Sequence, residues 1–152
     1  ISYAYDVLNH ITIDAQIEYC KASERDLATK HIETISNLKT DKINDLYIFD
    51  RGYPSLGLIF YLSNCKKDFL IRCSISSCFG KVKEAFDQGA KDKIIRLYAN
   101  QANDEQIKEI KKRVPSLDRK NAYIDIRMVV MQLSTGEEEL LITSLIDQEV
   151  YQ

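Results

Sequence analysis

Alternating apolar and polar positions open the chain. Apolar side chains recur at every second position over residues 3–7 and again over residues 11–17. A period of two is typical of strands that cover one face of a sheet. Asn9 and His10 separate the two runs and suit a tight turn. Residues 2–20 therefore predict an antiparallel β-hairpin.

The pattern changes to a helical period after the hairpin. Ser23, with Asp26 three positions further on, resembles a helix-capping arrangement. Apolar residues then recur close to one helical face, at Leu27, Ile32, Ile35 and Leu38. The polar run at residues 40–42 marks the end of this predicted helix.

A strand, a helix and a second strand follow. Residues 46–49 form a short, continuous apolar run, which predicts a strand covered on both faces. Pro54 or Ser55 begins a predicted helix that ends at Leu62. Residues 68–73 predict another buried strand. Because helices and strands alternate here, we expect the two strands to be parallel and joined by a right-handed crossover.

The rest of the chain adds helices and strands in a different order. A helix is predicted at residues 81–86 and a strand at 93–98. A charged helix at 104–114 is closed by Pro115, and two further strands are predicted at 123–133 and 140–146. The last two strands form a hairpin with Gly136 at a position of positive φ. The overall prediction is an α/β core at residues 1–73, a β-rich insertion at 74–137 and a returning core strand at 138–152.

The composition narrows the class of protein. The chain has 152 residues, 45% of them apolar and 29% charged, which is the profile of a soluble globular domain. Its net charge of -2 gives no strong overall field, so contact with nucleic acid would require a local basic patch. The most apolar stretch, residues 56–62, is far shorter than the ~18 residues of a membrane span. Because the first residue is Ile1 rather than Met, we expect a piece of a longer, cytoplasmic protein.

Cysteine and histidine spacing argues against a zinc site. Cys20, Cys65, Cys73 and Cys78 include no Cys-x-x-Cys pair, and only two histidines could complete such a site. Nothing in the sequence indicates secretion, so a disulfide framework is not expected either. We expect four reduced and mostly buried cysteines.

Asp50 is the strongest candidate for chemistry. It directly follows the predicted strand at 46–49, and open α/β sheets place ligands at the carboxyl ends of their strands. Its carboxylate would suit Mg²⁺, which combines one or two carboxylates with phosphate oxygens. Arg51 could hold an anionic group, and Gly52 permits a sharp turn. The structural alternative is that Asp50 only caps the turn or the helix that follows.

Other charged residues offer weaker candidates. Asp6 and Asp14 fall in the hairpin and are expected at the surface or near the turn. The acidic run 137–139 is expected to keep a hairpin tip soluble. Four basic residues could meet a DNA backbone or form a solvated face on the charged helix, beside its apolar stripe of Ile107 and Ile110: Lys108, Lys111, Lys112 and Arg113. The sequence contains no Gly-x-Ser-x-Gly elbow and no phosphate-binding glycine loop, so nucleophilic catalysis has no support.

The residues around Asp50 resemble a known family. The segment 45–55, Asp-Leu-Tyr-Ile-Phe-Asp-Arg-Gly-Tyr-Pro-Ser, is similar to the block that carries the second aspartate of bacterial insertion-sequence transposases of the IS-four family, whose catalytic triad is Asp-Asp-Glu. Further blocks resemble the same family in the same order and together span nearly the whole chain: residues 5–9, 13–15, 24–28, 31–33, 68–72, 127–130, 135–140 and 141–147. The ordered set is specific, although no single block would be.

The resemblance implies an RNase H-like core with an inserted β-rich subdomain. In that family three carboxylates hold two Mg²⁺ ions, which Mn²⁺ can replace, for DNA cleavage and strand transfer. Asp50 matches the second carboxylate, as a catalytic and metal-binding residue. Arg51 and Tyr53 match its neighbours, which would position DNA or metal. The implied partners are transposon-end and target DNA and a second copy of the protein, at the bacterial nucleoid and not at a membrane.

Two parts of the family pattern have no counterpart in this chain. The family's first aspartate lies on a strand before the hairpin, and its glutamate lies on a helix after the last strand. The resemblance therefore implies an incomplete core, without its first strand and last helix. Asp6 and Asp14 do not replace the other carboxylates, because the family's hairpin lies away from the Asp50 strand. We expect the chain alone to be marginally stable and, with one carboxylate of the triad, catalytically inactive.

Two other functions stay open. A non-catalytic remnant would bind DNA or the intact transposase as an inhibitor, and sequence outside residues 1 and 152 would distinguish it from an enzyme fragment. An unrelated phosphotransfer domain with Asp50 as the acceptor is the other alternative, although it lacks the usual acidic pair and lysine.

Overall fold

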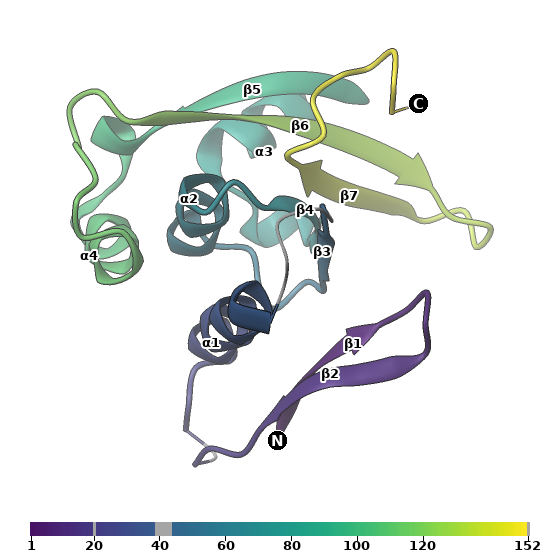
Figure 1. Ribbon diagram of the computed structural model, residues 1–152. Helices are drawn as coiled ribbons and strands as arrows, with labels where there is room; N and C mark the ends of the chain where they lie inside the picture. The colour runs from purple at the N-terminus through teal and green to yellow at the C-terminus, as the bar shows by residue number, and fades with distance from the viewer. Residues whose placement is uncertain (20, 39–43, 152) are drawn as a thin grey trace. The chain divides into compact units, whose positions relative to one another are not determined.

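The chain divides into two compact units. The computed structural model describes residues 1–19, 21–38 and 44–151 (Figure 1). The first unit covers Ile1–Asn44 and the second covers Asp45–Gln152. In the part of the chain that the structure describes, every helix is too short or too polar to cross a lipid bilayer.

The first unit begins with the expected hairpin. Strand β1 (Ser2–Asp6) pairs antiparallel with β2 (Ile11–Gln16). The hairpin closes at the pair Asp6 and Ile11, so its turn covers residues 7–10 and is longer than a two-residue turn at Asn9 and His10. The carboxylate of Asp6 accepts hydrogen bonds from the backbone N–H groups of Leu8 and Asn9 at 2.9 and 3.0 Å. His10 completes the turn with a φ of 58°. Asp6 is thus a turn residue, as the sequence predicted.

Helix α1 (Glu24–Leu38) contacts both strands of the hairpin. Most of its predicted apolar face is buried, at Leu27, Ile32 and Ile35. The backbone carbonyl of Ser23 accepts from the N–H groups of Asp26 and Leu27 at 3.0 Å, which begins the helix. Leu38, the last described residue of the helix, is 67% exposed, so it does not share the burial of the other three apolar residues predicted for this face. The predicted end of the helix at residues 40–42 lies outside the described residues.

The second unit is built on a five-stranded mixed sheet with the order β3-β4-β7-β6-β5. Its strands are β3 (Leu46–Phe49), β4 (Asp68–Cys73), β5 (Asp92–Tyr98), β6 (Tyr123–Gln132) and β7 (Glu138–Thr143). The pairing of β3 with β4 is parallel, as predicted, and the other pairings are antiparallel. The β6–β7 hairpin is also confirmed, and Gly136 in its turn has a φ of 86°.

Three helices of the second unit lie on one side of this sheet (Figure 1). They are α2 (Leu56–Asn64), α3 (Gly80–Asp87) and α4 (Asp104–Arg113), and two short 3₁₀ turns, η1 (Ile75–Ser77) and η2 (Ala99–Gln101), join strands to helices. Helix α2 contacts both β4 and α4, and its residues 56–62 are all buried. A short helix that is apolar on every side belongs between two layers. The strands contribute Phe69, Ile71, Leu140 and Ile142 to the same core.

Strand β3 is an edge strand, and one of its faces is exposed. Leu46 is 42% exposed and Ile48 is 59% exposed. The prediction that both faces of this strand are covered is therefore wrong for the described structure. A continuous apolar run is equally compatible with a central strand and with an edge strand whose second face is open, so the run alone could not decide.

The structure confirms a mixed α/β class, and an RNase H-like core stays a prediction. The predicted β-rich insertion at 74–137 contains β5 and β6. In the structure these strands continue, through β7, the same sheet that begins with β3 and β4. The boundary between the compact units falls between Asn44 and Asp45.

Candidate functional site

Asp50 lies at the carboxyl end of β3, where the strand stops. Its backbone carbonyl accepts a hydrogen bond from the Tyr53 N–H at 3.1 Å, which closes the turn. Helix α2 is capped by another residue, since the Ser55 hydroxyl accepts from the Leu58 N–H at 3.1 Å. The Asp50 side chain is 70% exposed, and its Oδ1 lies 3.2 Å from Nη1 of Arg72. The main chain of Asp50 therefore makes the turn, while its carboxylate remains accessible for chemistry.

Glu139 organises the residues beside Asp50. It lies on β7 and is 4% exposed. Arg51 donates to its two carboxylate oxygens from Nε and Nη2, at 3.2 and 2.7 Å, and Arg72 donates from Nη2 at 2.9 Å. These hydrogen bonds, first those from Arg51 and then those from Arg72, lower the pKa of Glu139 to about 2. Because charge-assisted bonds of this kind favour the ionised carboxylate, Glu139 stays negatively charged.

This position corrects the expectation that residues 137–139 only keep a hairpin tip soluble. Glu139 is a buried counter-ion rather than a solvated surface residue. Its neighbour Glu138 fits the expectation better, since it is exposed and pairs with Lys91. Three adjacent glutamates look alike in the sequence, and the alternation of β7 places Glu139 on the opposite face from Glu138, toward the arginines.

The four side chains form one continuous ionic cluster, Asp50, Arg51, Arg72 and Glu139. Arg72 bridges the two carboxylates, and it comes from β4, the strand that pairs with both β3 and β7. Hydrogen bonds to Glu139 raise the pKa of both Arg51 and Arg72, so both guanidinium groups are permanently charged. The Arg51 and Arg72 side chains are 50% and 44% exposed. The cluster thus presents two oriented cations and one accessible carboxylate to solvent.

Tyr53, the third residue suggested by the sequence, packs locally. Its ring lies 5.4 Å from the Phe49 ring, measured between centroids, with the planes tilted by 39°. The contact joins the turn after β3 to the last residue of that strand. Tyr53 therefore helps to hold the turn that presents Asp50.

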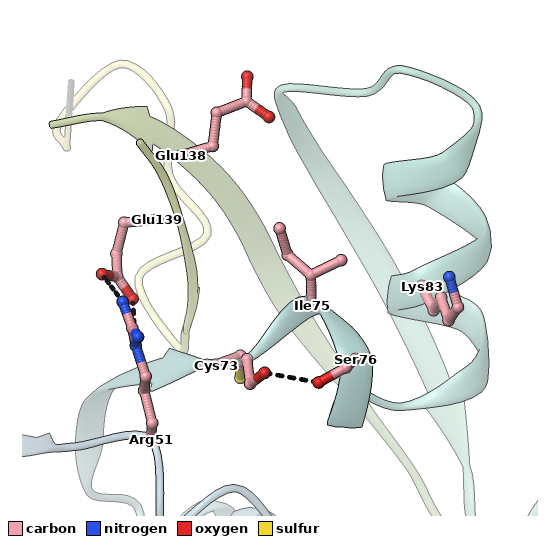
Figure 2. Close-up of a pocket in the computed structure, with 8 residues that line it drawn as sticks. Arg51, Cys73, Ile75, Ser76, Lys83, Glu138 and Glu139 are labelled. Atoms are coloured by element: carbon pink, nitrogen blue, oxygen red, sulfur yellow. Dashed lines mark hydrogen bonds and ion pairs between the residues drawn. The ribbon is translucent and has the colours of Figure 1, made fainter. Parts of the chain in front are cut away.

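A shallow hollow of about 400 Å³ adjoins the cluster (Figure 2). Arg51 and Glu139 form one wall, and the remaining lining residues are Cys73, Ser74, Ile75, Ser76, Lys83 and Glu138. Burial raises the pKa of the Cys73 thiol to about 12, so this cysteine is not a nucleophile at neutral pH. Lys83 is paired with Asp87 at 2.9 Å. Through Arg51 and Glu139, the hollow is continuous with the ionic cluster.

Asp50 could supply one of the ligands of a magnesium site. Among the described residues, no group of three or more His, Cys, Asp or Glu side chains could hold a metal ion. Asp50 supplies one exposed carboxylate, and Mg²⁺ commonly takes one or two carboxylates together with phosphate oxygens and water. Glu139 is engaged by two arginines and is not a free ligand.

The basic residues of α4 do not act as one surface. Ile107 and Ile110 are buried, as predicted, and Lys108, Lys111 and Lys112 are exposed. Arg113 differs from them: its side chain is 5% exposed, and Nη1 lies 3.4 Å from Oε1 of Glu109. The expectation that Arg113 belongs to the solvated face with the three lysines is therefore wrong. One helical turn separates Arg113 from Glu109, which explains the pairing.

The cysteines that the structure describes are free thiols. Cys73 is buried, whereas Cys65 and Cys78 are half-buried. The three thiols are free, as expected, but the expected burial holds for Cys73 and not for Cys65 or Cys78. Cys20 lies outside the described residues.

The first unit contains a hydrogen-bonded chain that the sequence reasoning missed. His31 on α1 is 6% exposed, and its Nδ1 lies 2.6 Å from Oδ2 of Asp14 on β2. Its Nε2 lies 3.0 Å from the hydroxyl of Ser2 on β1. Hydrogen bonds from Gln16 and His31 lower the pKa of Asp14. The sequence does contain a sign that His31 is buried, because it lies one helical turn from both Leu27 and Ile35 on the apolar face.

This chain joins all three elements of the first unit, so we assign it a structural role. Asp14 is thus a partner of a buried histidine rather than a surface residue of the hairpin, which corrects the expectation for it. A buried imidazole needs hydrogen-bond partners for both nitrogens, and Ser2 and Asp14 supply them.

Comparison with known proteins returns no relative: no family model, no curated protein and no solved structure matches this chain.

Proposed function

We propose that this chain is part of the catalytic domain of a DNA transposase that uses an Asp-Asp-Glu triad, with Asp50 as the second carboxylate. The observation that carries the proposal is the position of Asp50. It follows the edge strand of the parallel β3–β4 pair, and its carboxylate is exposed while its main chain makes the turn. Ligands and catalytic groups of open α/β sheets concentrate at this end of the strands.

The charges around Asp50 suit a phosphodiester substrate. Arg51 and Arg72 flank the carboxylate, and guanidinium groups bind phosphate with two parallel hydrogen bonds. Glu139 holds both arginines in place through its buried carboxylate. In this proposal the exposed edges of the two arginines orient the DNA backbone toward Asp50.

Magnesium would supply the remaining chemistry. Bound in pairs, Mg²⁺ ions activate a water or a 3′-hydroxyl group and stabilise the leaving oxygen, and Mn²⁺ can substitute for them. Asp50 would contribute one ligand to that site, and two further carboxylates would complete it. With Asp50 as the one matching carboxylate, the chain alone is inactive in this proposal.

The exposed edge of β3 is consistent with an RNase H-like core. Such a core would place a further strand beside β3, at the edge where the described five-stranded sheet ends.

The same proposal names the partners of the complete protein. They are transposon-end DNA, target DNA and a second copy of the protein, at the bacterial nucleoid. The net charge of -2 implies that DNA contact depends on local features such as Arg51 and Arg72 rather than on the overall field.

Iron-directed cleavage of the protein tests the assignment of Asp50. Fe²⁺ occupies many Mg²⁺ sites, and with ascorbate and peroxide it generates radicals that cut the nearby backbone. In the presence of a short DNA duplex we expect cleavage close to residue 50, competed by excess Mg²⁺ or Mn²⁺. Asp50→Asn should abolish this cut because the amide is a poor ligand for a hard cation.

Asp87→Asn is the matched control. Asp87 is also an exposed carboxylate paired with a cation, Lys83, and it lies on α3 away from the strand ends. This variant should keep the cleavage at residue 50. Cleavage that persists in Asp50→Asn, or that never occurs near residue 50, would contradict the proposed metal ligand.

A further inference from the structure

Two tyrosines face each other across the far edge of the sheet. Tyr98 on β5 and Tyr123 on β6 are directly opposite in the strand register. Their ring centroids lie 6.0 Å apart, and the ring planes are tilted by 50°. Tyr98 is 36% exposed and Tyr123 is 51% exposed. The pair is therefore a contiguous aromatic surface that remains accessible to solvent.

The tyrosines lie on the exposed face of their two strands. Their neighbours along the strands, Leu97 and Ile124, are 6% exposed and point into the core. Because successive side chains of a strand point to opposite faces, Tyr98 and Tyr123 lie on the face opposite Leu97 and Ile124, and Lys81 in the first turn of α3 reaches the Tyr98 ring. Because Leu97 and Ile124 occupy the buried face, the two tyrosine rings lie on the exposed face.

One cation lies beside each of the two rings. Nζ of Lys81 lies 4.9 Å from the centre of the Tyr98 ring, and Cζ of Arg96 lies 4.1 Å from the centre of the Tyr123 ring. We call Lys81, Arg96, Tyr98 and Tyr123 the tyrosine–cation cluster. Distances of this kind are typical of cation–π contacts, which hold the cations beside the rings.

Neighbouring groups fix the two cations. Arg96 donates from Nε and Nη2 to the two carboxylate oxygens of Asp125, both at 2.7 Å. Lys81 donates to the backbone carbonyl of Arg96 at 3.2 Å. The cluster is consequently ordered before any ligand arrives, which lowers the entropy cost of binding.

We propose that the tyrosine–cation cluster is a binding site for single-stranded nucleic acid. Exposed aromatic rings stack on bases of any sequence, and adjacent lysine or arginine side chains attract the phosphates. The Tyr123 ring carries Arg96 on one side, so a base would stack on the accessible remainder of the ring. Lys81 would meet the neighbouring phosphate. Duplex DNA is a poorer ligand, since its bases are already stacked on one another.

This site is separate from the ionic cluster at Asp50. Strands β3 and β5 are the two opposite edges of the sheet, and the tyrosine–cation cluster belongs to the β5 edge. Stacking requires no divalent cation. The proposal therefore goes beyond the proposed function, and a measurement in EDTA separates the two.

Fluorescence anisotropy of a labelled oligonucleotide tests the site. The probe is a thymine DNA of about 15 nucleotides, near the footprint of a single-strand-binding module, at low salt and in EDTA. The wild-type chain should bind this strand more tightly than a duplex of equal length. Tyr98→Leu and Tyr123→Leu should each weaken binding about tenfold, the loss of one base–ring contact. Lys81→Gln should reduce the slope of log affinity against log salt by about 0.7, the value for one phosphate contact on a single strand.

Two control variants separate stacking from general surface effects. Tyr123→Phe keeps the ring and should bind like the wild type. Tyr19→Leu removes a tyrosine of the first unit that is 90% exposed, and it should also leave binding unchanged. Circular dichroism of each variant verifies that the fold is retained. Absence of binding at low salt, equal binding of the duplex, or unchanged binding by Tyr98→Leu and Tyr123→Leu would each overturn the proposal.

Discussion

Arg51 and Glu139 lie 88 residues apart in the sequence and form a two-point ion pair, with nitrogen–oxygen distances of 3.2 and 2.7 Å. Arg51 stands in the turn after β3, and Glu139 is the second residue of β7. The pair exists because β4 lies between these strands in the sheet and contributes Arg72 to the same carboxylate. One buried acid therefore ties the candidate site to the middle of the sheet.

This relationship predicts an acid-sensitive contribution to stability. The pKa of Glu139 is about 2 in the folded chain and near 4.5 when it is solvated. A lowered folded-state pKa means that the stabilisation is complete above about pH 4.5 and is lost as the pH falls toward 2. The contribution should be about 1–3 kcal/mol, given that both arginine partners are partly exposed.

Urea unfolding across this pH range provides the measurement. Glu139→Gln should be less stable than the wild type at pH 7, because it removes the carboxylate paired with Arg51 and one of the two carboxylates paired with Arg72. The stability difference between the two proteins should shrink as the pH falls from about 5 to 2. Glu138→Gln, one residue away on the exposed face, is the control and should follow the wild type. A constant difference across the range would show that Glu139 is not the titrating group.

Close packing of α2 on α4 predicts a different sensitivity at Gly57. A Cβ atom at this position would lie 2.7 Å from Cγ and 3.0 Å from the backbone oxygen of Glu109. Gly57→Ala should therefore destabilise the chain by about 1–3 kcal/mol despite the higher helix propensity of alanine. Thermal or urea unfolding measures the effect.

Gly80 supplies the matched control for that substitution. It is also in a helix, at the start of α3, and nothing lies within 4 Å of its added Cβ. Gly80→Ala should be neutral or stabilising. Adding Glu109→Ala to Gly57→Ala should recover part of the lost stability, since it removes the side-chain part of the clash. Equal effects at the two glycines would contradict the close approach of α2 and α4.

The buried histidine predicts a local loss of order in the first unit. His31→Ala removes the hydrogen bonds to Ser2 and Asp14 and leaves a small cavity, at a cost of about 2–4 kcal/mol. Amide hydrogen exchange should accelerate in β1, β2 and α1. The protected strands of the second unit, β4 and β7, should exchange as in the wild type.

His10→Asn is the corresponding control. His10 has a φ of 58° in the turn between β1 and β2, and asparagine tolerates this left-handed conformation. Exchange in α1 should not change. Faster exchange throughout β4 and β7 in His31→Ala would show that His31 stabilises more than the first unit.

A single matching carboxylate predicts the absence of strand cleavage. The purified chain should not nick supercoiled plasmid with Mg²⁺ or Mn²⁺, and Asp50→Ala should behave in the same way. The reason is that a two-metal site requires further carboxylates. Nicking by the wild type that Asp50→Ala abolishes would refute this expectation, and another carboxylate of the chain would then have to complete the site.

Local periodicity predicted most of the elements and part of the candidate site. The hairpin, the parallel β3–β4 pair and the β6–β7 turn at Gly136 all agree with the structure, because side-chain spacing and turn chemistry act over a few residues. Asp50 and Arg51 were found in the same way, as polar residues directly after an apolar run. Their family resemblance rests on the sequence alone.

The tertiary structure decided which charged side chains meet. Glu139 and Arg72 contact each other in the candidate site, and Asp14 contacts His31. Arg113 is buried and contacts Glu109. The tertiary structure also decided that β3 is an edge strand with Ile48 exposed. Except for the pairing of Arg113 with Glu109, which are one helical turn apart, these outcomes depend on how separate segments of the chain pack and pair. The alternation of a strand determines that one face will be buried, and only the neighbouring strands and helices determine which partner each side chain finds there.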